Sequence, residues 1–262
     1  MNNNIRALFF DIDGTLVSFS THRIPDSTVS ALEQAKHNGV KIYISTGRPV
    51  SLIVNLSQID SLIDGYVSTN GAYCFVGNDV VSCSSMLRHD VDVILSACEE
   101  WRVPAVVVGT DKIAVFQEDG SIDKAFRVGL GINNVVFSPL DEVLEGPILQ
   151  LTPFFSPEQE ALVMPRLEAC TSGRWTPAFT DITSVKADKG LGLRAMAAHE
   201  GLAIGQTMAF GDGGNDIPIL RTAGVGVAMG NAGEEVKAVA GYVTTSVDED
   251  GVMNALRHFH VI

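Results

Sequence analysis

The sequence predicts an α/β protein that is built on a parallel sheet and interrupted by an α+β insertion. Apolar segments alternate with helical segments at both ends of the chain, an order typical of βαβ units with right-handed crossovers. The apolar segments are continuous, as expected of strands that are buried on both faces of a sheet. In the middle of the chain this alternation gives way to helix pairs and adjacent strands, which predicts a second unit.

The N-terminal part predicts the first βαβαβ unit. Pro25 lies at the start of the first helix and Gly39 ends it. A hairpin is predicted around Gly71 and Gly77, where glycine favours a tight turn. The predicted elements are strand 5–10, helix 26–38, strand 40–45, helix 49–57 and strand 65–69.

The α+β insertion is predicted from residue 82 onward. Its elements are helix 89–101, strands 105–109 and 112–116, helix 121–129, strand 147–152, helix 157–169 and short strands near 174–175 and 179–183. Alternation then resumes with helix 188–200, strand 207–210, helix 215–221, strand 225–228, helix 233–239, strand 241–244 and helix 249–258. We therefore expect one discontinuous α/β domain, 1–81 with 185–262, that carries an inserted domain, 82–184.

Composition limits the classes of function. The 262 residues carry a net charge of −13, which would repel nucleic acid and anionic membranes, so neither is expected as a partner. We expect no signal peptide and no apolar run of the roughly 18 residues that a membrane helix needs, and hence a cytoplasmic protein. The four cysteines lack metal-binding spacing and are expected to be free thiols. No obligate protein partner is indicated.

Two clusters of aspartates each follow an apolar strand. Asp11 and Asp13 follow the first predicted strand, and Asp212 and Asp216 follow the strand that ends at Phe210. Open α/β sheets bind ligands at the carboxyl ends of their strands. Two carboxylates about 4 Å apart repel each other by roughly 4 kcal/mol at an effective dielectric near 20. A hard divalent cation with oxygen ligands is therefore expected at this edge.

Each cluster also has an ordinary structural interpretation. The first is compatible with a solvated Asp-Gly turn, and the second with a glycine-rich turn that carries an aspartate helix cap. A calcium loop of the EF-hand type is excluded, because Leu16 and His22 occupy positions that need glycine and glutamate. Two such clusters at two strand ends of one sheet favour a shared functional site.

Two further polar features suit a phosphate group. Thr46, Gly47 and Arg48 follow strand 40–45 and offer a hydroxyl, an open backbone and a guanidinium. The alternative for Thr46 is a helix N-cap. Lys189 lies in the first turn of a predicted helix, where its positive charge is unfavourable next to the positive end of the helix macrodipole. This mildly unfavourable position indicates a functional role. The alternative for Lys189 is a solvated surface lysine.

Taken together and in order, these segments resemble the haloacid dehalogenase superfamily. The pattern of that family is DxDGT, a strand-terminal Ser or Thr, a Lys, and GDxxND. The matching residues are Asp11-Ile12-Asp13-Gly14-Thr15, Thr46, Lys189 and Gly211-Asp212-Gly213-Gly214-Asn215-Asp216. The segments after Gly226 look like the Cof-type branch, and the likeness is closest to bacterial hexose-phosphate phosphatases. The long interval between the second and third motifs matches the subclass IIB arrangement.

The resemblance implies a Rossmann-like, doubly wound core with an α+β cap of the C2B type. It implies a Mg²⁺-dependent phosphatase that hydrolyses small phosphorylated sugars, hexose phosphates favoured, through an aspartyl-phosphate. The implied roles are Asp11 as nucleophile, Asp13 as general acid and base, Thr46, Gly47, Lys189 and Asn215 as phosphate ligands, and Asp11, Asp13, Asp212 and Asp216 as the Mg²⁺ site. Arg48 is a candidate substrate contact.

One position departs from the family pattern, and alternative functions stay open. Pro218 stands where the family often has another residue, and we expect a tightened helix start there with the chemistry kept. A phosphomutase would use the same nucleophile but return the phosphoryl group to the sugar. A phospho-acceptor switch of the receiver type also uses aspartates and a lysine, but it is about half this length. An ion-pumping ATPase is excluded because no membrane span is expected.

Overall fold

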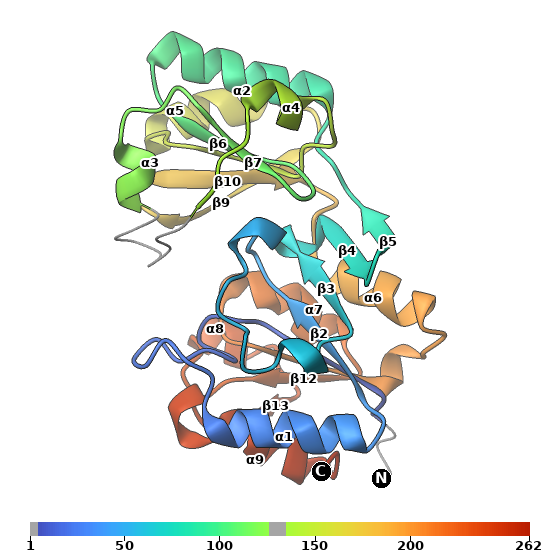
Figure 1. Cartoon of the computed structure of the whole chain (residues 1–262). Helices are drawn as coiled ribbons and strands as arrows, with labels where there is room; N and C mark the ends of the chain where they lie inside the picture. The colour runs from blue at the N-terminus through green and yellow to red at the C-terminus, as the bar shows by residue number, and fades with distance from the viewer. Residues whose placement is uncertain (1–4, 126–134) are drawn as a thin grey trace. The chain divides into compact units, whose positions relative to one another are not determined.

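The computed structural model describes residues 5–125 and 135–262, and the chain divides into two compact units (Figure 1). The core unit comprises Met1–Arg48, Ile53–Cys83 and Asp188–Ile262. The insert unit comprises Pro49–Leu52 and Ser84–Ala187. Assignment of 1–81 with 185–262 as a catalytic domain, and of 82–184 as its cap, stays a proposal.

The core unit is organised around an eight-stranded sheet. Neighbouring strands from β13 to β3 are parallel, and β4 and β5 add an antiparallel hairpin at one edge. In sheet order the strands are β13 (Tyr242–Val243), β12 (Val225–Ala228), β11 (Thr207–Gly211), β1 (Ala7–Phe10), β2 (Lys41–Ser45), β3 (Gly65–Ser68), β4 (Tyr73–Val76) and β5 (Asp79–Cys83).

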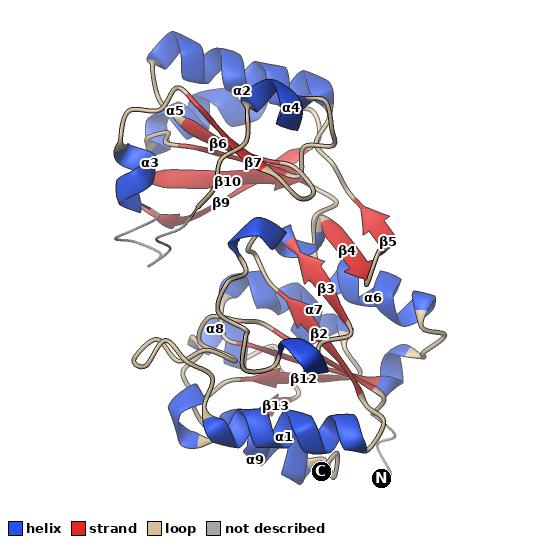
Figure 2. Ribbon diagram, viewed as in Figure 1, coloured by secondary structure: helices blue, strands red, loops and turns tan. Residues whose placement is uncertain are grey.

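Helices cover both faces of this sheet, which explains why its strands are continuously apolar. Leu8 and Phe10 of β1 pack in the same cluster as residues of α1 and α9. Ala7 and Phe9 face the other way and pack with residues of α6 and α7. Figure 2 shows the strands in red and the helices in blue. The helices of the core unit are α1 (Asp26–His37), α6 (Lys189–His199), α7 (Ile217–Thr222), α8 (Glu234–Lys237) and α9 (Gly251–His258).

The order of the strands gathers three chain segments at one edge. β1 lies between β11 and β2, so that Phe10 pairs with Phe210 on one side and with Ile44 on the other. Because these strands are parallel, the residues that follow their carboxyl ends emerge at the same edge of the sheet. The first aspartate cluster, the second aspartate cluster and the segment after Ser45 therefore meet there.

The insert unit has the predicted α+β composition. Helices α2 and α5 pack against one face of a five-stranded antiparallel sheet, where Ile94 and Val163 contribute to a core with Val107, Leu151 and Ile182. In sheet order its strands are β7 (Ile113–Phe116), β6 (Ala105–Val108), β8 (Gln150–Pro153), β10 (Phe179–Ser184) and β9 (Cys170–Thr176). Its helices are α2 (Arg88–Trp101), α3 (Ser121–Lys124), α4 (Leu140–Leu144) and α5 (Pro157–Val163).

Two of the predicted helices are wrong in part or whole. The predicted helix 49–57 is only a 3₁₀ turn, Val50–Leu52, because the β-branched residues that follow, Ile53 and Val54, are poor helix formers. The predicted helix 157–169 ends early, since Pro165 lies in a 3₁₀ turn after α5 and cannot continue the hydrogen bonding of an α-helix.

Three other segments complete the comparison with the sequence. Helix α4 was not predicted, because its five residues are too short to show a helical period. The predicted helix 121–129 begins as α3, and its end lies outside the described residues. The expected tightening near Pro218 is present, since a 3₁₀ turn, Gly214–Asp216, precedes α7.

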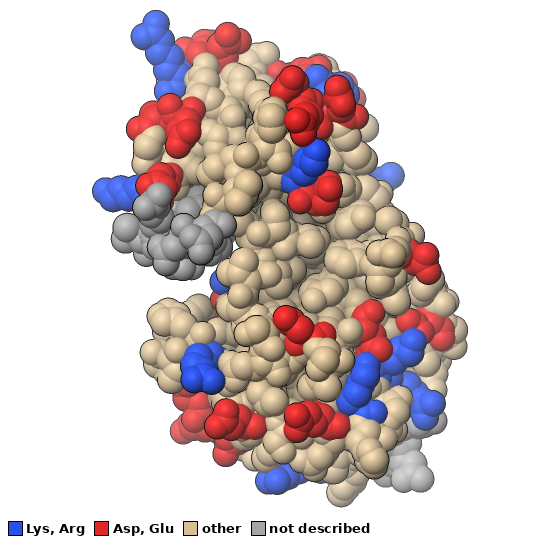
Figure 3. All heavy atoms as spheres, in the orientation of Figure 1, with Lys and Arg blue, Asp and Glu red and all other residues tan. Residues whose placement is uncertain are grey.

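Surface charge and helix length bear on the predicted partners. Across the described ranges, no helix is long and apolar enough to cross a bilayer. Figure 3 shows one face of the molecule, on which acidic and basic side chains are interspersed. The expected absence of nucleic-acid and membrane partners stays a prediction.

We predict that Gly226→Ala lowers the free energy of unfolding by about 1–3 kcal/mol. A Cβ at this buried position in β12 would collide with the backbone carbonyl oxygen of Leu220 in α7, which no side-chain rotation can relieve. Urea unfolding followed by circular dichroism measures the change. The matched control is Gly205→Ala, where a Cβ meets no atom within 4 Å, and its stability should change by no more than about 0.5 kcal/mol. Equal midpoints for the two variants would contradict this account of the packing.

Candidate active site

A buried lysine lies at the centre of the candidate site. The Nζ atom of Lys189 is 2.8 Å from Oδ1 of Asp11 and 2.6 Å from Oδ1 of Asp216. Only 1% of Lys189 is exposed, so the interpretation of this residue as a solvated surface lysine is wrong. The Asp188 side chain caps helix α6 by accepting the backbone N–H of Leu191 at 2.8 Å, and this fixes the helix start from which Lys189 projects.

Three carboxylates converge beside this ammonium group. Asp11, Asp212 and Asp216 each offer an oxygen, and these oxygens all lie within 4.8 Å of one another. Oxygen donors of this kind are the ligands that Mg²⁺ and Ca²⁺ prefer, so the donor set fits a hard divalent cation. The carboxyl groups of 11 and 212, which come from opposite ends of the chain, thus share one candidate cation site.

The three carboxylates differ in the number of hydrogen bonds they accept. Besides the lysine contact, Oδ2 of Asp216 accepts the backbone N–H groups of Asp212 and Gly213, both at 3.0 Å. Asp216 therefore holds the turn after β11 in place and keeps less freedom to bind a cation directly. Asp11 accepts a hydrogen bond from the lysine alone among the described residues.

Burial and mutual repulsion shift the protonation of this group. The pKa of Asp11 is raised to about 8, chiefly by burial and then by the charge of Asp216, while Lys189 opposes the shift. Burial and Asp216 also raise the pKa of Asp212 to about 6. For Lys189, burial acts to lower the pKa, but the two carboxylates outweigh it and hold the pKa above its usual range. One ammonium does not offset three carboxylates, two of them buried, so the site favours a second cation.

The segment after β2 lies beside Asp13. The Oγ1 atom of Thr46 accepts the backbone N–H of Arg48 at 3.1 Å, and no helix begins here, so the N-cap interpretation of Thr46 is wrong. The Arg48 guanidinium donates to both oxygens of Asp13, through Nε at 2.8 Å and Nη2 at 2.7 Å. The Asp13 side chain is therefore held by a two-point contact and is not among the three carboxylates of the cation cluster.

Two residues that support Asp212 were not assigned a role from the sequence. The Thr15 hydroxyl donates to Oδ1 of Asp212 at 3.1 Å, and the Asn231 amide donates to Oδ2 at 3.2 Å. Asn231 also donates to the Gly14 carbonyl at 2.9 Å and accepts the Val247 N–H at 3.0 Å. Both residues lie in segments that carry the family resemblance, and that position was the one available signal.

A third unassigned residue, Asn70, contacts a predicted phosphate ligand. The Nδ2 atom of Asn215 donates to Oδ1 of Asn70 at 3.1 Å. Asn70 precedes Gly71, around which the sequence predicts a hairpin, and that prediction gives Asn70 no role of its own. The structure therefore places Asn215 beside a side chain of the β3–β4 connection.

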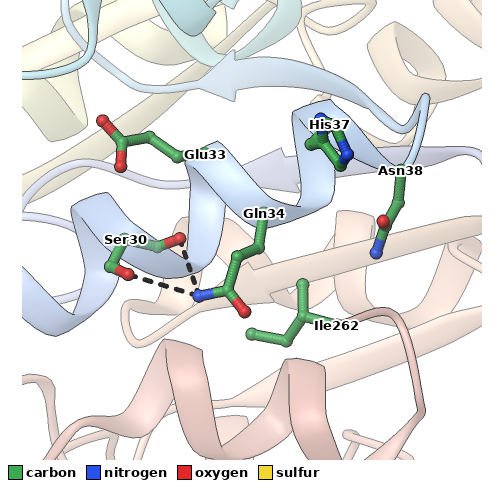
Figure 4. Close-up of a pocket in the computed structure, with 6 residues that line it drawn as sticks. All are labelled: Ser30, Glu33, Gln34, His37, Asn38 and Ile262. Carbon is green, nitrogen blue, oxygen red and sulfur yellow. Dashed lines mark hydrogen bonds between the residues drawn. The ribbon is translucent and has the colours of Figure 1, made fainter.

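A pocket in the core unit lies on a different surface. Figure 4 shows its lining residues, which come from α1 and the C-terminus: Ser30, Glu33, Gln34, His37, Asn38 and Ile262. The Gln34 amide donates to the Ser30 backbone and hydroxyl, and the Asn38 amide donates to the Val261 carbonyl at 2.9 Å. The Asn38 amide ties the end of the helix to the chain end, whereas the Gln34 amide stays within the helix. None of the predicted site residues lines this pocket.

A family model for haloacid dehalogenase-like hydrolases matches residues 8–256. The chain belongs to this family. Among solved structures, the hydrolase is similar to BT4131, a sugar phosphatase of subclass IIB, with 47% identity, a TM-score of 0.88 and coverage of 98% of this chain and 100% of that one. The predicted superfamily and its α/β fold are thereby confirmed.

Two further relatives show the range of this family. BT1666 from Bacteroides thetaiotaomicron, one of its phosphatases, is 34% identical with a TM-score of 0.86, over 99% of this chain and 97% of that one. The 5-amino-6-(5-phospho-D-ribitylamino)uracil phosphatase YcsE of Bacillus subtilis (strain 168) is 26% identical over 259 residues, 98% of this chain and 96% of its own. The hydrolase is an enzyme of the phosphatase class.

We predict that, in EDTA, the stability of the hydrolase falls as the pH rises from about 4 to about 8. The pKa values of Asp11 (about 8) and Asp212 (about 6) lie above the ordinary value of 3.8, so the folded state keeps protons that the unfolded chain releases. The folded state is therefore fully stabilised below the ordinary pKa and loses this stabilisation as the pH rises through the folded values. Urea midpoints measured across this window test the sign.

Two controls separate the carboxylates from the rest of the protein. Asp11→Asn should flatten much of the slope, because it removes the group with the larger shift. Added Mg²⁺ should also flatten it, since a bound cation offsets the charge that appears on deprotonation. A slope that rises with pH, or one that neither change affects, would contradict this description of the cluster.

Proposed function

We propose that this hydrolase is a Mg²⁺-dependent phosphatase of small phosphorylated sugars, with hexose phosphates favoured, and that it acts through an aspartyl-phosphate on Asp11. The proposal is carried by one observation, the contact of the Lys189 ammonium with Asp11 inside a cluster of three carboxylates. Similarity to the sugar phosphatase BT4131 over nearly the whole chain supports the class of substrate.

The position of Asp11 supports its proposed role as the nucleophile. It follows the central strand of the sheet, it is 93% buried, and Lys189 holds one of its two oxygens, so the other is left to attack phosphorus in line. In the proposed assignment, phosphoryl oxygens are bound by the Thr46 hydroxyl, the Gly47 N–H, the Lys189 ammonium and the Asn215 amide. These donors offset the repulsion that carboxylates exert on an anionic substrate.

Asp13 supplies the proton transfers in this mechanism. It protonates the leaving sugar oxygen in the first half-reaction and deprotonates the attacking water in the second. The two hydrogen bonds from Arg48 use one lone pair on each of its oxygens and hold the carboxyl group in one orientation. Arg48 is thereby also brought next to the reacting groups, which supports its assignment as a candidate substrate contact.

The acidic cluster fits the proposed cation. Asp11, the Asp13 carbonyl and Asp212 would hold Mg²⁺, with Asp216 orienting the group, and the ion supplies positive charge that stabilises the phosphoryl group during transfer. The protein's own contribution is to bury the carboxylates and to fix their spacing with Thr15, Asn231 and Lys189.

We predict that the hydrolase releases inorganic phosphate from hexose phosphates in the presence of Mg²⁺. Removal of the metal with EDTA, or the substitution Asp11→Asn, should abolish this activity. The amide of the variant cannot form an aspartyl-phosphate, so the rate should fall by at least about 10³-fold. Asp79→Asn, the same change at an exposed position in β5, is the matched control and should retain activity. Metal-independent hydrolysis or an active Asp11→Asn variant would refute the mechanism.

The same assay separates the alternatives. A phosphomutase would yield an isomeric sugar phosphate with little free phosphate, and a phospho-acceptor switch would be phosphorylated once without turnover. A panel of hexose, pentose and triose phosphates and nucleotides tests the substrate class, and a strong preference for nucleotides would overturn the assignment to sugars.

We predict that Asp13→Asn affects the two half-reactions differently, depending on whether the leaving group needs a proton. With p-nitrophenyl phosphate, whose leaving group needs no proton, the variant should give a burst of one p-nitrophenolate per site. Steady turnover should then be slower by roughly 10²–10⁴-fold, because the base that activates water is gone. With a hexose phosphate as substrate, the initial burst of released sugar should be absent as well, because its leaving oxygen needs the proton that Asp13 supplies. Rapid-quench kinetics measures both phases, and unchanged steady turnover would exclude Asp13 as the base.

A further inference from the structure

The connection between β3 and β4 has a backbone conformation that its residues rarely adopt. Thr69 and Asn70 have φ angles of 50° and 53°, in the left-handed region. This conformation is tolerated by asparagine but is unfavourable for threonine, whose Cβ is branched. Thr69 is completely buried, and its hydroxyl oxygen has no hydrogen-bond partner in the described structure. The surrounding structure must therefore hold this turn in place.

Hydrogen bonds to the segment after β2 hold the turn. The N–H of Thr69 donates to the carbonyl of Arg48 at 3.1 Å, and the N–H of Asn70 donates to the carbonyl of Thr46 at 3.0 Å. The strained turn is thus attached to both ends of the Thr46–Arg48 segment. Since this segment carries two of the proposed phosphate ligands, the turn and those ligands form one unit.

The side chain of Asn70 is directed toward the space above Gly47. A Cβ added to Gly47 would lie 3.1 Å from Oδ1 and 3.4 Å from Nδ2 of Asn70, and 3.4 Å from Nδ2 of Asn215. Two amides from opposite sides of the sheet edge therefore converge where residue 47 has no side chain. Their contact through Oδ1 of Asn70 leaves the Nδ2 group of Asn70 without a hydrogen-bond partner among the described residues.

We propose that Asn70 is a further phosphoryl-binding residue, whose Nδ2 group donates to a phosphoryl oxygen beside Gly47 and Asn215. This inference rests on the proposed function, because it assumes that the phosphoryl group binds at this edge of the sheet. Asn70 has a second role as a positioning residue, since its Oδ1 atom fixes the amide of Asn215. The strained backbone places both ends of the side chain where these roles need them.

Two substitutions of Asn70 separate the contributions of its backbone conformation, its Nδ2 donor and its Oδ1 acceptor. Asn70→Gly keeps the left-handed conformation at no steric cost and removes the amide. Asn70→Asp also tolerates that conformation and keeps an oxygen that can accept from Asn215, but it replaces the donor with a negative charge. Asn78→Gly, in the exposed turn between β4 and β5, is the matched control for the glycine substitution.

The test is calorimetric binding of inorganic phosphate to the whole chain in Mg²⁺, with thermal midpoints recorded for each variant. Asn70→Gly should weaken phosphate binding roughly tenfold, because one hydrogen bond to a charged group is lost. Asn70→Asp should weaken it more, although it keeps the acceptor for Asn215. Asn78→Gly should bind like the unaltered protein, and the thermal midpoints of the Asn70 variants should stay close to it.

Three results would overturn parts of this inference in distinguishable ways. Unchanged phosphate binding in Asn70→Gly would remove Asn70 from the site. Phosphate binding by Asn70→Asp as tight as that of the unaltered protein would limit Asn70 to positioning Asn215. Failure of the unaltered protein both to bind phosphate and to hydrolyse phosphate esters would instead overturn the proposed function, and this inference with it.

Discussion

The buried contact of Lys189 with Asp11 and Asp216 is the interaction on which the candidate site depends. It joins the end of the central strand, the start of α6 and the turn after β11 through a single ammonium group. Removing one partner from a buried ion pair typically destabilises a protein by about 3–5 kcal/mol, because a charge is left without compensation. The same contact orients the oxygen atoms of two of the three carboxylates, so folding and the proposed chemistry rely on one arrangement.

Charge balance explains why a protein with a net charge of −13 is suited to an anionic substrate. The candidate site sets an ammonium, a guanidinium and amide donors beside its carboxylates, so the repulsion of a phosphoryl group is reduced where it would bind. The proposed cation completes this balance. The net charge of the chain is therefore a poor guide to its substrate, because the proposed function depends on a small number of buried or half-buried groups.

The fold, and the grouping of polar residues that forms the candidate site, were predictable because they follow from short-range patterns. Continuous apolar strands, helix boundaries and polar residues at strand ends are all readable along the chain, and parallel pairing then brings the strand ends together. Contacts between side chains could not be predicted from the sequence in the same way. The burial of Lys189, the support of Asp212 by Thr15 and Asn231, and the left-handed turn at Thr69 depend on tertiary neighbours. The helix wrongly predicted for 49–57 has a local cause instead, since the β-branched residues Ile53 and Val54 are poor helix formers.

The position of β1 between β11 and β2 has a consequence for biosynthesis. β2 emerges from the ribosome soon after β1, but β11 is about 200 residues later in the chain, beyond the whole insert unit. Until then one side of β1 remains an unpaired strand edge, which is a template for association with other nascent chains. Asp11 likewise lacks both the lysine and the second aspartate cluster during this interval. The candidate site is therefore assembled only after α6 and β11 have been synthesised, about 180 to 200 residues after Asp11.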